Sequence, residues 1–389
     1  MAGAGRFKAE EVAIISVNGR YYRDWESVIV HLAEGESNNS FRFSCSEGKP
    51  LAKNWAEIRI RPGDHCTVKL AGELIISGYV EQRQVAYAAE QHGIEIVGHS
   101  YTKAVADGSA GHKTGEFRNK PFQQIADEVL KPFGIKFIPL TAISQKPFDR
   151  ANIPPGETAW RFLETLARSR GIILGTDVQG NMTGRTGSIG GGGGDSLIEG
   201  VNILEGREVM SVDQGTGPNF AYSQQNADNN KWGAKVTHDA NANSTAQVMP
   251  TGKGVHAQNV VLAEHPGDKQ DTQTRADFES KQRGTENLQV TIVVQGWLKP
   301  SGGLWKPGAK AHVKSPMLIL DEDLDIKTVT FSQDSRSGSR TTLELVRDMG
   351  PGRDFSSTNT GSPPGETTGS PTTPSQDPSG APSNLPSVI

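Results

Sequence analysis

One glycine-rich stretch of the sequence has the spacing of a loop that could hold a phosphate, TGRTGSIGGGGGD at residues 183–195. A phosphate loop ends at the N-terminus of a helix, where free N–H groups and the helix dipole meet the anion. The residues that follow, DSLIEGVNIL, contain Gly200, lack a Lys-Ser/Thr pair and have an apolar pattern that favours a short strand. We therefore predict a flexible connector and no cofactor, with nucleotide binding as the weaker alternative.

Three other groups of residues could do chemistry, and each has a simpler structural explanation. His65 and Cys66 could form a thiol–imidazole pair, but adjacent residues of a strand point to opposite faces. Glu157 and Glu164, or the acidic run DEDLD at 321–325, could supply a pair of carboxylates, but charge runs near turns are usually solvated. The nine histidines show no metal-ligand spacing. The sequence thus predicts no catalytic, cofactor-binding or metal-binding residues, and a protein that is not an enzyme.

The composition favours many short strands joined by turns. The chain has 389 residues, 45 glycines and 22 prolines, and only 34% of its residues are hydrophobic. A net charge of −4 gives no general attraction for nucleic acid or for an anionic membrane. Two cysteines, Cys45 and Cys66, exclude a disulfide scaffold and are expected to be buried thiols on strands. The N-terminal stretch lacks the pattern of a signal peptide and no segment has the length of a membrane span, so we expect folding in a cytoplasm and no membrane embedding.

Residues 12–100 contain seven apolar runs that alternate with turn signals, which predicts a small antiparallel β-barrel. The runs are VAIISV, WESVIVHLA, SFRFSCS, WAEIRIR, HCTVKLA, ELIISGYVEQRQVAYAA and GIEIVGHS.

The middle of the chain is expected to form a compact α+β module with two amphipathic helices. Residues 121–131 and 157–170 have apolar residues on one helical stripe, and Gly171 is placed to end the second helix. A short apolar strand is expected after each helix. The first stripe is Phe122, Ile125, Ala126, Val129 and Leu130, and the second is Ala159, Trp160, Phe162, Leu163, Leu166 and Ala167.

Two segments of the sequence, one in its first part and one in its last, share the same pattern and indicate an internal repeat. The segment that begins at Arg61 matches the segment that begins at Lys306, with Pro62-Gly63 aligned to Pro307-Gly308 and Val68-Lys69 to Val313-Lys314. Upstream, VIVHL and SFRFS have a looser counterpart in EVMSV and NFAYS. Coincidence is the alternative, because Pro-Gly before a strand is a common turn. The preserved order of strand, turn and strand favours duplication.

The predicted fold is therefore mainly β with α+β. It has two similar antiparallel β-barrels, of which the second is interrupted by an insertion, and a small α+β module. The Pro/Ser/Thr-rich C-terminal tail cannot bury enough apolar surface to order itself. The predicted ranges are 1–105 for the first barrel, 106–198 for the module with its glycine-rich connector, 199–235 with 306–350 for the second barrel, 236–305 for an inserted α+β segment that includes the helical stretch DTQTRADFESKQR, and 351–389 for the tail.

Five segments in this order resemble the baseplate hub proteins of Mu-type contractile-tailed phages, a family similar in plan to the late-control protein D family and to the hub portion of VgrG spikes. The segments are 78–110 (GYVEQRQVAYAAEQHGIEIVGHSYTKAVADGSA), 121–137, 154–174, 291–316 and 329–347. Each motif is weak, but their order and spacing are specific. The resemblance does not cover the C-terminal tail, and the five consecutive glycines depart from the family.

The resemblance implies a structural hub in the virion tail that is assembled in the host cytoplasm. It implies a homotrimer that joins a six-fold tail tube to a three-fold spike. The expected partners are other copies of the chain, the tail spike or baseplate protein and the tail tube or distal tail proteins, with a tape-measure protein as a further candidate and no specific nucleic acid. The alternative is a tail-associated cell-wall-binding or lytic component, although no lysozyme-like or peptidase-like segment is present.

Overall fold

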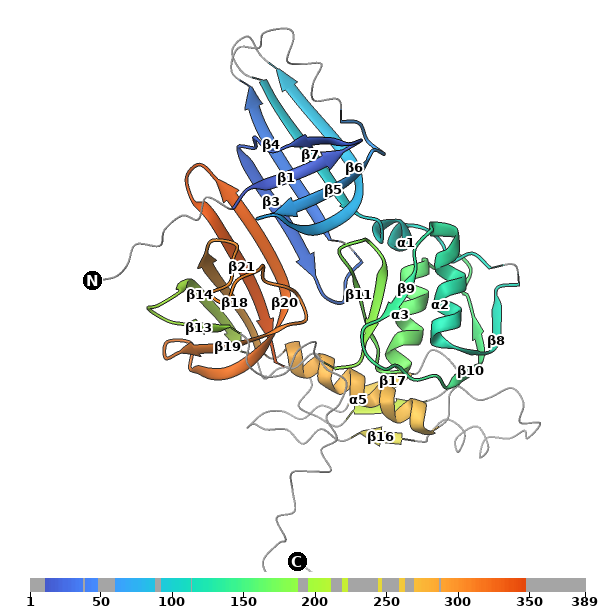
Figure 1. Cartoon of the computed structure of the whole chain (residues 1–389). Coiled ribbons are helices and arrows are strands. Elements are labelled where there is room, and N and C mark those ends of the chain that lie inside the picture. Colours follow the sequence, from blue (N-terminus) through green and yellow to red (C-terminus); the bar gives the residue numbers. More distant parts are fainter. Residues whose placement is uncertain are drawn as a thin grey trace, which may run out of the picture. The chain divides into compact units, whose positions relative to one another are not determined.

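The structure is a computed structural model (Figure 1) that describes residues 11–37, 39–47, 60–87, 92–112, 114–187, 195–210, 219–222, 244–246, 259–262, 269–286 and 288–347. The glycines of the connector, most of the expected strand WAEIRIR and the whole C-terminal tail lie outside these residues.

The other six strands expected before residue 100 are confirmed, and the turn at Asn18-Gly19 adds a short seventh strand. They are β1 (Ala13–Val17), β2 (Arg20–Tyr22), β3 (Ser27–Ala33), β4 (Ser40–Glu47), β5 (His65–Leu70), β6 (Glu73–Tyr87) and β7 (His92–Ser100). Alternation of apolar and polar residues explains their placement. In β4, for example, Phe41 and Phe43 are buried while Arg42 between them is exposed.

The second half of the chain supplies a comparable set of strands. They are β13 (Ser196–Ile198), β14 (Ile203–Met210), β18 (Leu288–Gln295), β19 (Lys310–Ser315), β20 (Leu320–Asp334) and β21 (Gly338–Val346). The two sets join in one large sheet with the order β14-β18-β21-β20-β3-β4-β7-β6-β5-β1-β2, and β13 and β19 branch from β20. All these pairs are antiparallel except β13 with β19.

Pairing within the two sets supports the duplication. In the first set the order β3-β4-β7-β6-β5 corresponds to β14-β18-β21-β20-β19 in the second. The Pro-Gly turns also match: Gly63 N–H donates to Val80 O at 2.8 Å, and Gly308 N–H donates to Ile326 O at 2.8 Å. We call the first set of five strands the first repeat and the second set the second repeat.

The described strands do not form the two closed barrels that the sequence analysis predicts. They form one open path, because β3, at the end of the first repeat, pairs with β20 of the second repeat. Six residue pairs join these strands, among them Val30 with Phe331, and both side chains are fully buried. The apolar side chains of both repeats therefore share one core.

The upstream part of the predicted repeat also needs a correction. NFAYS does not correspond to SFRFS, because β15 (Asn219–Tyr222) pairs with β16 (Ser244–Ala246) and β17 (Asn259–Leu262) in a separate small sheet. The strand equivalent to β4 is β18, which pairs with β14 and β21. Residues 288–295, assigned above to the insertion, therefore lie within the second repeat.

The two predicted helices are confirmed, and their apolar stripes are buried in a second core. They are α2 (Phe122–Leu130) and α3 (Ala159–Ser169), and every residue of both stripes is buried. The Thr158 hydroxyl accepts a hydrogen bond from Arg161 N–H at the start of α3, and Gly171 has a φ of +65° just after its end.

The remaining elements complete this module. They are α1 (Lys103–Asp107), a 3-10 turn at Lys131–Phe133, the hairpin of β8 (Glu116–Pro121) with β10 (Pro147–Asn152), and the three-stranded sheet of β9 (Phe137–Pro139), β11 (Ile173–Thr176) and β12 (Met182–Arg185).

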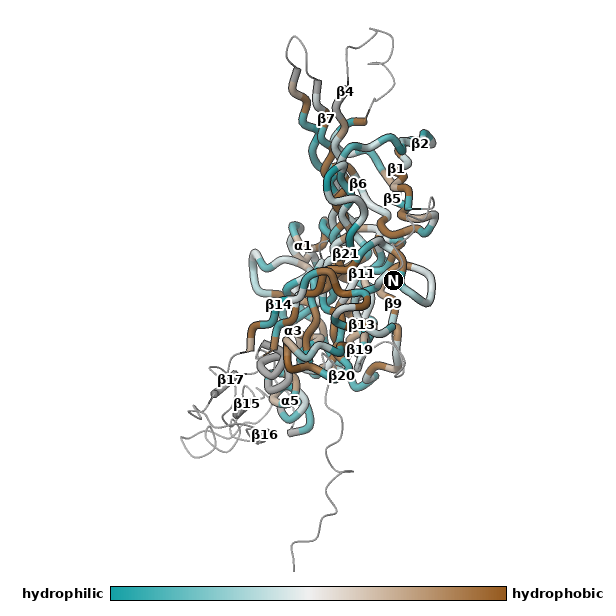
Figure 2. The backbone as a smooth tube through the Cα atoms, turned by 90° about the vertical axis from the view of Figure 1, so that its left-hand side faces the viewer, coloured by the Kyte–Doolittle hydropathy of each residue, from teal (hydrophilic) through white to brown (hydrophobic). Residues whose placement is uncertain are grey.

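The predicted helical stretch DTQTRADFESKQR is confirmed as α5 (Lys269–Glu286). Figure 2 shows α5 mostly in the hydrophilic colours. None of the helices in the described part of the chain has the length and apolar character needed to cross a membrane.

Candidate functional site

The glycine-rich stretch begins as a buried strand and ends before another strand. All four residues of β12, Met182 to Arg185, are buried, and the residues after Asp195 form β13, as expected. Asp195 itself accepts hydrogen bonds from Ser301 N–H at 2.8 Å and from Ser301 Oγ at 2.7 Å. Since no helix follows the glycines, the stretch lacks the element that a phosphate loop requires.

Arg185, the arginine of this stretch, takes part in a buried charged junction. Its Nε donates to Glu34 Oε1 at 2.7 Å, and the side chains of Arg185 and Glu34 are 1% and 11% exposed. Beside them, Asp325 is completely buried and lies 3.2 Å from Lys310 Nζ. We call Glu34, Arg185, Lys310 and Asp325 the charged junction.

The charged junction lies where the two repeats and the helical module meet. Glu34, just after β3, donates its N–H to Lys327 O of β20 at 2.9 Å. The next residue, Gly35, donates its N–H to Leu174 O of β11 at 3.1 Å. Burial raises the pKa of Glu34, and the Arg185 guanidinium offsets only part of this effect. The desolvation of such a buried pair offsets much of the attraction between its charges.

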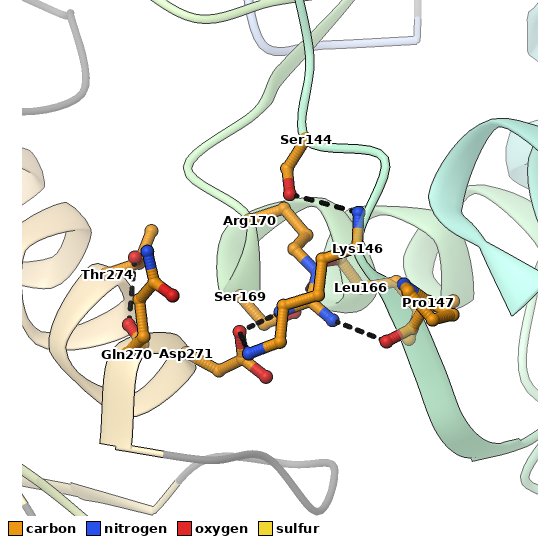
Figure 3. Close-up of polar contacts among 9 residues, drawn as sticks. All are labelled: Ser144, Lys146, Pro147, Leu166, Ser169, Arg170, Gln270, Asp271 and Thr274. Atoms are coloured by element: carbon orange, nitrogen blue, oxygen red, sulfur yellow. Dashed lines mark hydrogen bonds and ion pairs between the residues drawn. The ribbon is translucent and has the colours of Figure 1, made fainter. Parts of the chain in front are cut away.

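A second charged cluster, shown in Figure 3, connects α5 to the module. Arg170, at the end of α3, is 3% exposed and forms an ion pair with Asp271 of α5. Its Nη2 also donates to Pro147 O at 3.2 Å, and its guanidinium lies 4.1 Å from the centre of the Phe148 ring. Lys146 Nζ approaches the same Asp271 carboxylate at 3.0 Å. Charge pairing thus holds α5, whose own sequence is hydrophilic, against the module.

The residues considered above for catalysis are not arranged as reacting groups. His65 is exposed and Cys66 is buried on the opposite face of β5, as the alternation predicts. Burial raises the pKa of the Cys66 thiol to about 12, so the thiolate nucleophile is not available near neutral pH. Glu157, just before α3, forms an ion pair with Arg161, and Glu164 within α3 forms one with Arg168.

The acidic run at 321–325 has two different surroundings. Asp321 and Asp323 are exposed on β20, as expected for a solvated charge run. Asp325, by contrast, is buried in the charged junction, which the sequence analysis missed. Among the described residues no group of three or more His, Cys, Asp or Glu side chains could hold a metal ion.

His312 gives a prediction for pH dependence. Its Nδ1 lies 2.8 Å from Asp323 and its Nε2 3.0 Å from Asp321, and hydrogen bonds to these carboxylates raise its pKa above 6.5. The protonated form is thus favoured in the folded state, so this contribution to stability is complete below pH 6.5 and is lost as the pH rises through the raised value. We expect His312→Gln to lower the denaturation midpoint at pH 6 more than at pH 9. An equal effect of the substitution at both pH values would contradict this assignment.

Exposed large apolar side chains are concentrated in and near the second repeat. Six of the eleven found among the described residues lie there, which favours a surface that contacts other proteins. They are Val201, Leu204, Val209, Met210, Met317 and Ile319.

The charged junction and the cluster at Arg170 were both missed by the sequence analysis. Glu34 and Arg185 are 151 residues apart, and no periodic pattern connects them. The only available signal was that Arg185 stands in an otherwise small and uncharged stretch that directly precedes the connector.

Comparisons with known proteins identify the kind of protein that carries these features. Three family models match successive segments: the N-terminal domain of Mu phage baseplate assembly protein GpP-like proteins (residues 12–100), the second domain of baseplate hub protein gp44-like proteins (102–183) and the fourth domain of Mu phage baseplate assembly protein GpP (268–351). Baseplate hub protein gp44 of Escherichia phage Mu is 21% identical over 345 residues, which cover 85% of this chain and 86% of the relative.

Solved structures show the same fold over most of the chain. The 43 kDa tail protein of prophage MuSo2 from Shewanella oneidensis has a TM-score of 0.71 and 26% identity, covering 87% of this chain and 98% of that chain. The tail protein from Neisseria meningitidis MC58 has a TM-score of 0.71 and 19% identity, covering 86% of this chain and 96% of that chain.

The protein is a structural component of the baseplate of a Mu-like phage tail. Over residues 12–100, 102–183 and 268–351 the chain matches domains of the Mu phage baseplate hub proteins of the gp44-like and GpP-like kind, whose role is non-enzymatic.

Proposed function

We propose that the chain is a homotrimeric adaptor that joins a six-fold tail tube to a three-fold spike. The observation that carries this proposal is the duplication of five strands with matched order and matched turns. A trimer can satisfy a six-fold partner only if each chain presents two near-equivalent surfaces. Three chains with two repeats each provide six such surfaces.

The repeats are expected to alternate around the ring, with the first repeat of one copy beside the second repeat of the next. Such head-to-tail contacts close at three copies only if the two repeats in each chain keep a nearly fixed angle. The β3–β20 pairing and the charged junction both support a fixed angle, because they join the repeats to each other and to the helical module. The module therefore acts as a rigid brace. The spike would bind one face of the ring and the tube the other, around a pore that admits DNA or a tape-measure protein.

The mass of the full chain in solution tests this proposal. We expect a trimer, either for the chain alone or when it is mixed with its spike protein, measured by mass photometry and light scattering. Averaged electron-microscope images should show a ring with six similar lobes. A chain that stays monomeric with and without the spike protein would contradict the adaptor, and hydrolysis of peptidoglycan by the purified monomer would favour the lytic alternative.

A further inference from the structure

Two strand edges, one in each repeat, lack a pairing partner among the described residues. β14 pairs through one edge with β18, and no described strand pairs with its other edge. In β6, residues 82–87 pair with β7 on one side, while β5 covers only residues 73–79 on the other side. Open edges present rows of free N–H and C=O groups and are normally covered or protected.

Both edges also expose apolar side chains. On β14, Leu204, Val209 and Met210 are 48%, 45% and 59% exposed, and on β6 Val85 is 49% exposed. Exposed apolar groups beside an unpaired backbone edge are expected where another strand adds to the sheet.

The chain already contains the contact that these edges would make. Inside the chain β3 of the first repeat pairs with β20 of the second repeat. In the repeat correspondence, β14 is the equivalent of β3 and β6 is the equivalent of β20. The two open edges are therefore the equivalents of the two strands that form the internal junction.

The strand register can be transferred residue by residue. In the first repeat a ladder of directly paired residues runs Val80, Gly98, Phe41, Val30, and in the second it runs Ile326, Leu345, Val290, Glu208. Both ladders start at the carbonyl that accepts the hydrogen bond of the Pro-Gly turn, and both pass a bulge just beyond it. Val30 and Glu208 are thus equivalent positions.

The internal junction then fixes the partner of Glu208. Val30 pairs with Phe331, which stands as far after Ile326 as Val85 stands after Val80. The equivalent pair between two chains is therefore Glu208 with Val85.

We propose that β14 of one copy pairs antiparallel with residues 82–87 of β6 in the neighbouring copy, with Glu208 opposite Val85. This contact reproduces between chains the β3–β20 junction within the chain, and it rests on the proposed trimer. Repeated three times, it closes a ring in which internal and intermolecular junctions alternate.

The side chains at this register are complementary. Arg83 lies opposite Met210 and diagonal to Glu208, so opposite charges come within reach on one face of the sheet. Val85 lies diagonal to Met210, which covers two of the exposed apolar side chains. The same chain supplies both members of this charge pair, which favours a second copy over an unrelated partner.

In the second repeat, the connection between β18 and β19, residues 296–309, leaves the equivalent edge of β20 to β3. By the repeat correspondence, the partner of the β6 edge is β14 of the neighbouring copy.

Disulfide trapping in the full chain tests the register. Directly opposed strand residues have Cα atoms about 4.5–5.5 Å apart, within the range that a disulfide spans. We expect Val85→Cys with Glu208→Cys to give covalently linked dimers and trimers on oxidation, and each single variant to give none. Val85→Cys with Arg207→Cys, displaced by one residue to the other face of β14, is the matched control and should give few. Single-cysteine variants mixed together should yield dimers only.

A charge exchange provides a second readout that does not depend on cysteine. We expect Arg83→Glu to weaken the association of three copies roughly tenfold, and Glu208→Arg in the same chain to restore it. Both side chains lie on open edges, and circular dichroism checks that the variants fold. Loss of trimers that the double variant does not restore would contradict the pairing of these two residues.

Hydrogen exchange separates this inference from the proposed function. Amides of residues 203–210 should gain protection in the trimer relative to the diluted chain. Suppose that the wild-type chain forms trimers, but the variant with Val85→Cys and Glu208→Cys does not cross-link and the amides of β14 gain no protection. That result overturns the edge pairing but leaves the adaptor standing. A chain that never forms trimers overturns the adaptor itself.

Discussion

Leu163→Asp is expected to lower the free energy of unfolding of the helical module by roughly 4 kcal/mol, because it places an unpaired charge in a packed core. Leu163 lies in α3, is completely buried and packs with α2 and the small sheet of the module. Leu163→Ala should cost less, about 2–3 kcal/mol, at the lower end of the range for buried Leu→Ala changes, since it leaves a cavity and no charge. The measurement is the midpoint of unfolding in urea. Hydrogen exchange of the amides in α3 shows whether the loss of stability lies in this helix.

Leu140→Asp is the matched control, because Leu140 belongs to the same module and is 47% exposed. It should shift the midpoint little. An unchanged midpoint for Leu163→Asp would contradict the packed core. Leu163→Asp also tests the proposed brace in assembly: tails that carry this variant at full occupancy and look normal would show that the proposed ring depends on the two repeats alone.

The helices of this module were predictable from the sequence because their apolar residues recur with helical spacing. The stripe from Phe122 to Leu130 and the stripe from Ala159 to Ala167 are both buried in full. Capping residues then fixed the ends of α3, with Thr158 before it and Gly171 after it. Strands with strict alternation, such as β4, were predictable for the same local reason.

Features that depend on contacts distant in sequence were not predictable. A barrel and an open sheet share the same alternating strands, and only the pairing of β3 with β20 distinguishes them. The equivalent of β4 was misplaced because the insertion separates β14 from β18 by 77 intervening residues. Glu34 and Asp325 had the sequence context of solvated charges, and their burial arises only when the two repeats meet.

Arg185→Met is expected to cost about 3–5 kcal/mol at pH 8, because it leaves Glu34 as a buried carboxylate without its counter-charge. The cost should depend on pH. Burial already raises the pKa of Glu34 above 4.5, and loss of the guanidinium removes an influence that lowers it. A carboxyl with a raised pKa favours the folded state below its ordinary pKa, and this contribution is lost as the pH rises through the raised value. The variant should therefore be closer to the wild type at pH 5 than at pH 8.

A double-mutant cycle with Glu34→Gln distinguishes a coupled pair from two independent packing defects. Once Arg185 is replaced by Met, Glu34→Gln should recover part of the loss at pH 8, because it removes the unpaired charge. The pair Glu164 and Arg168 on α3 is the matched control: it is also an ion pair, but both side chains are about 30% exposed, so its coupling should be only about 0.3–0.5 kcal/mol. If the cycle at the charged junction gave a value as small as this control, the junction could not hold the two repeats and the module at a fixed angle. The proposed ring would then depend on the β3–β20 pairing alone, and Arg185→Met chains should form the proposed trimers as readily as the wild type.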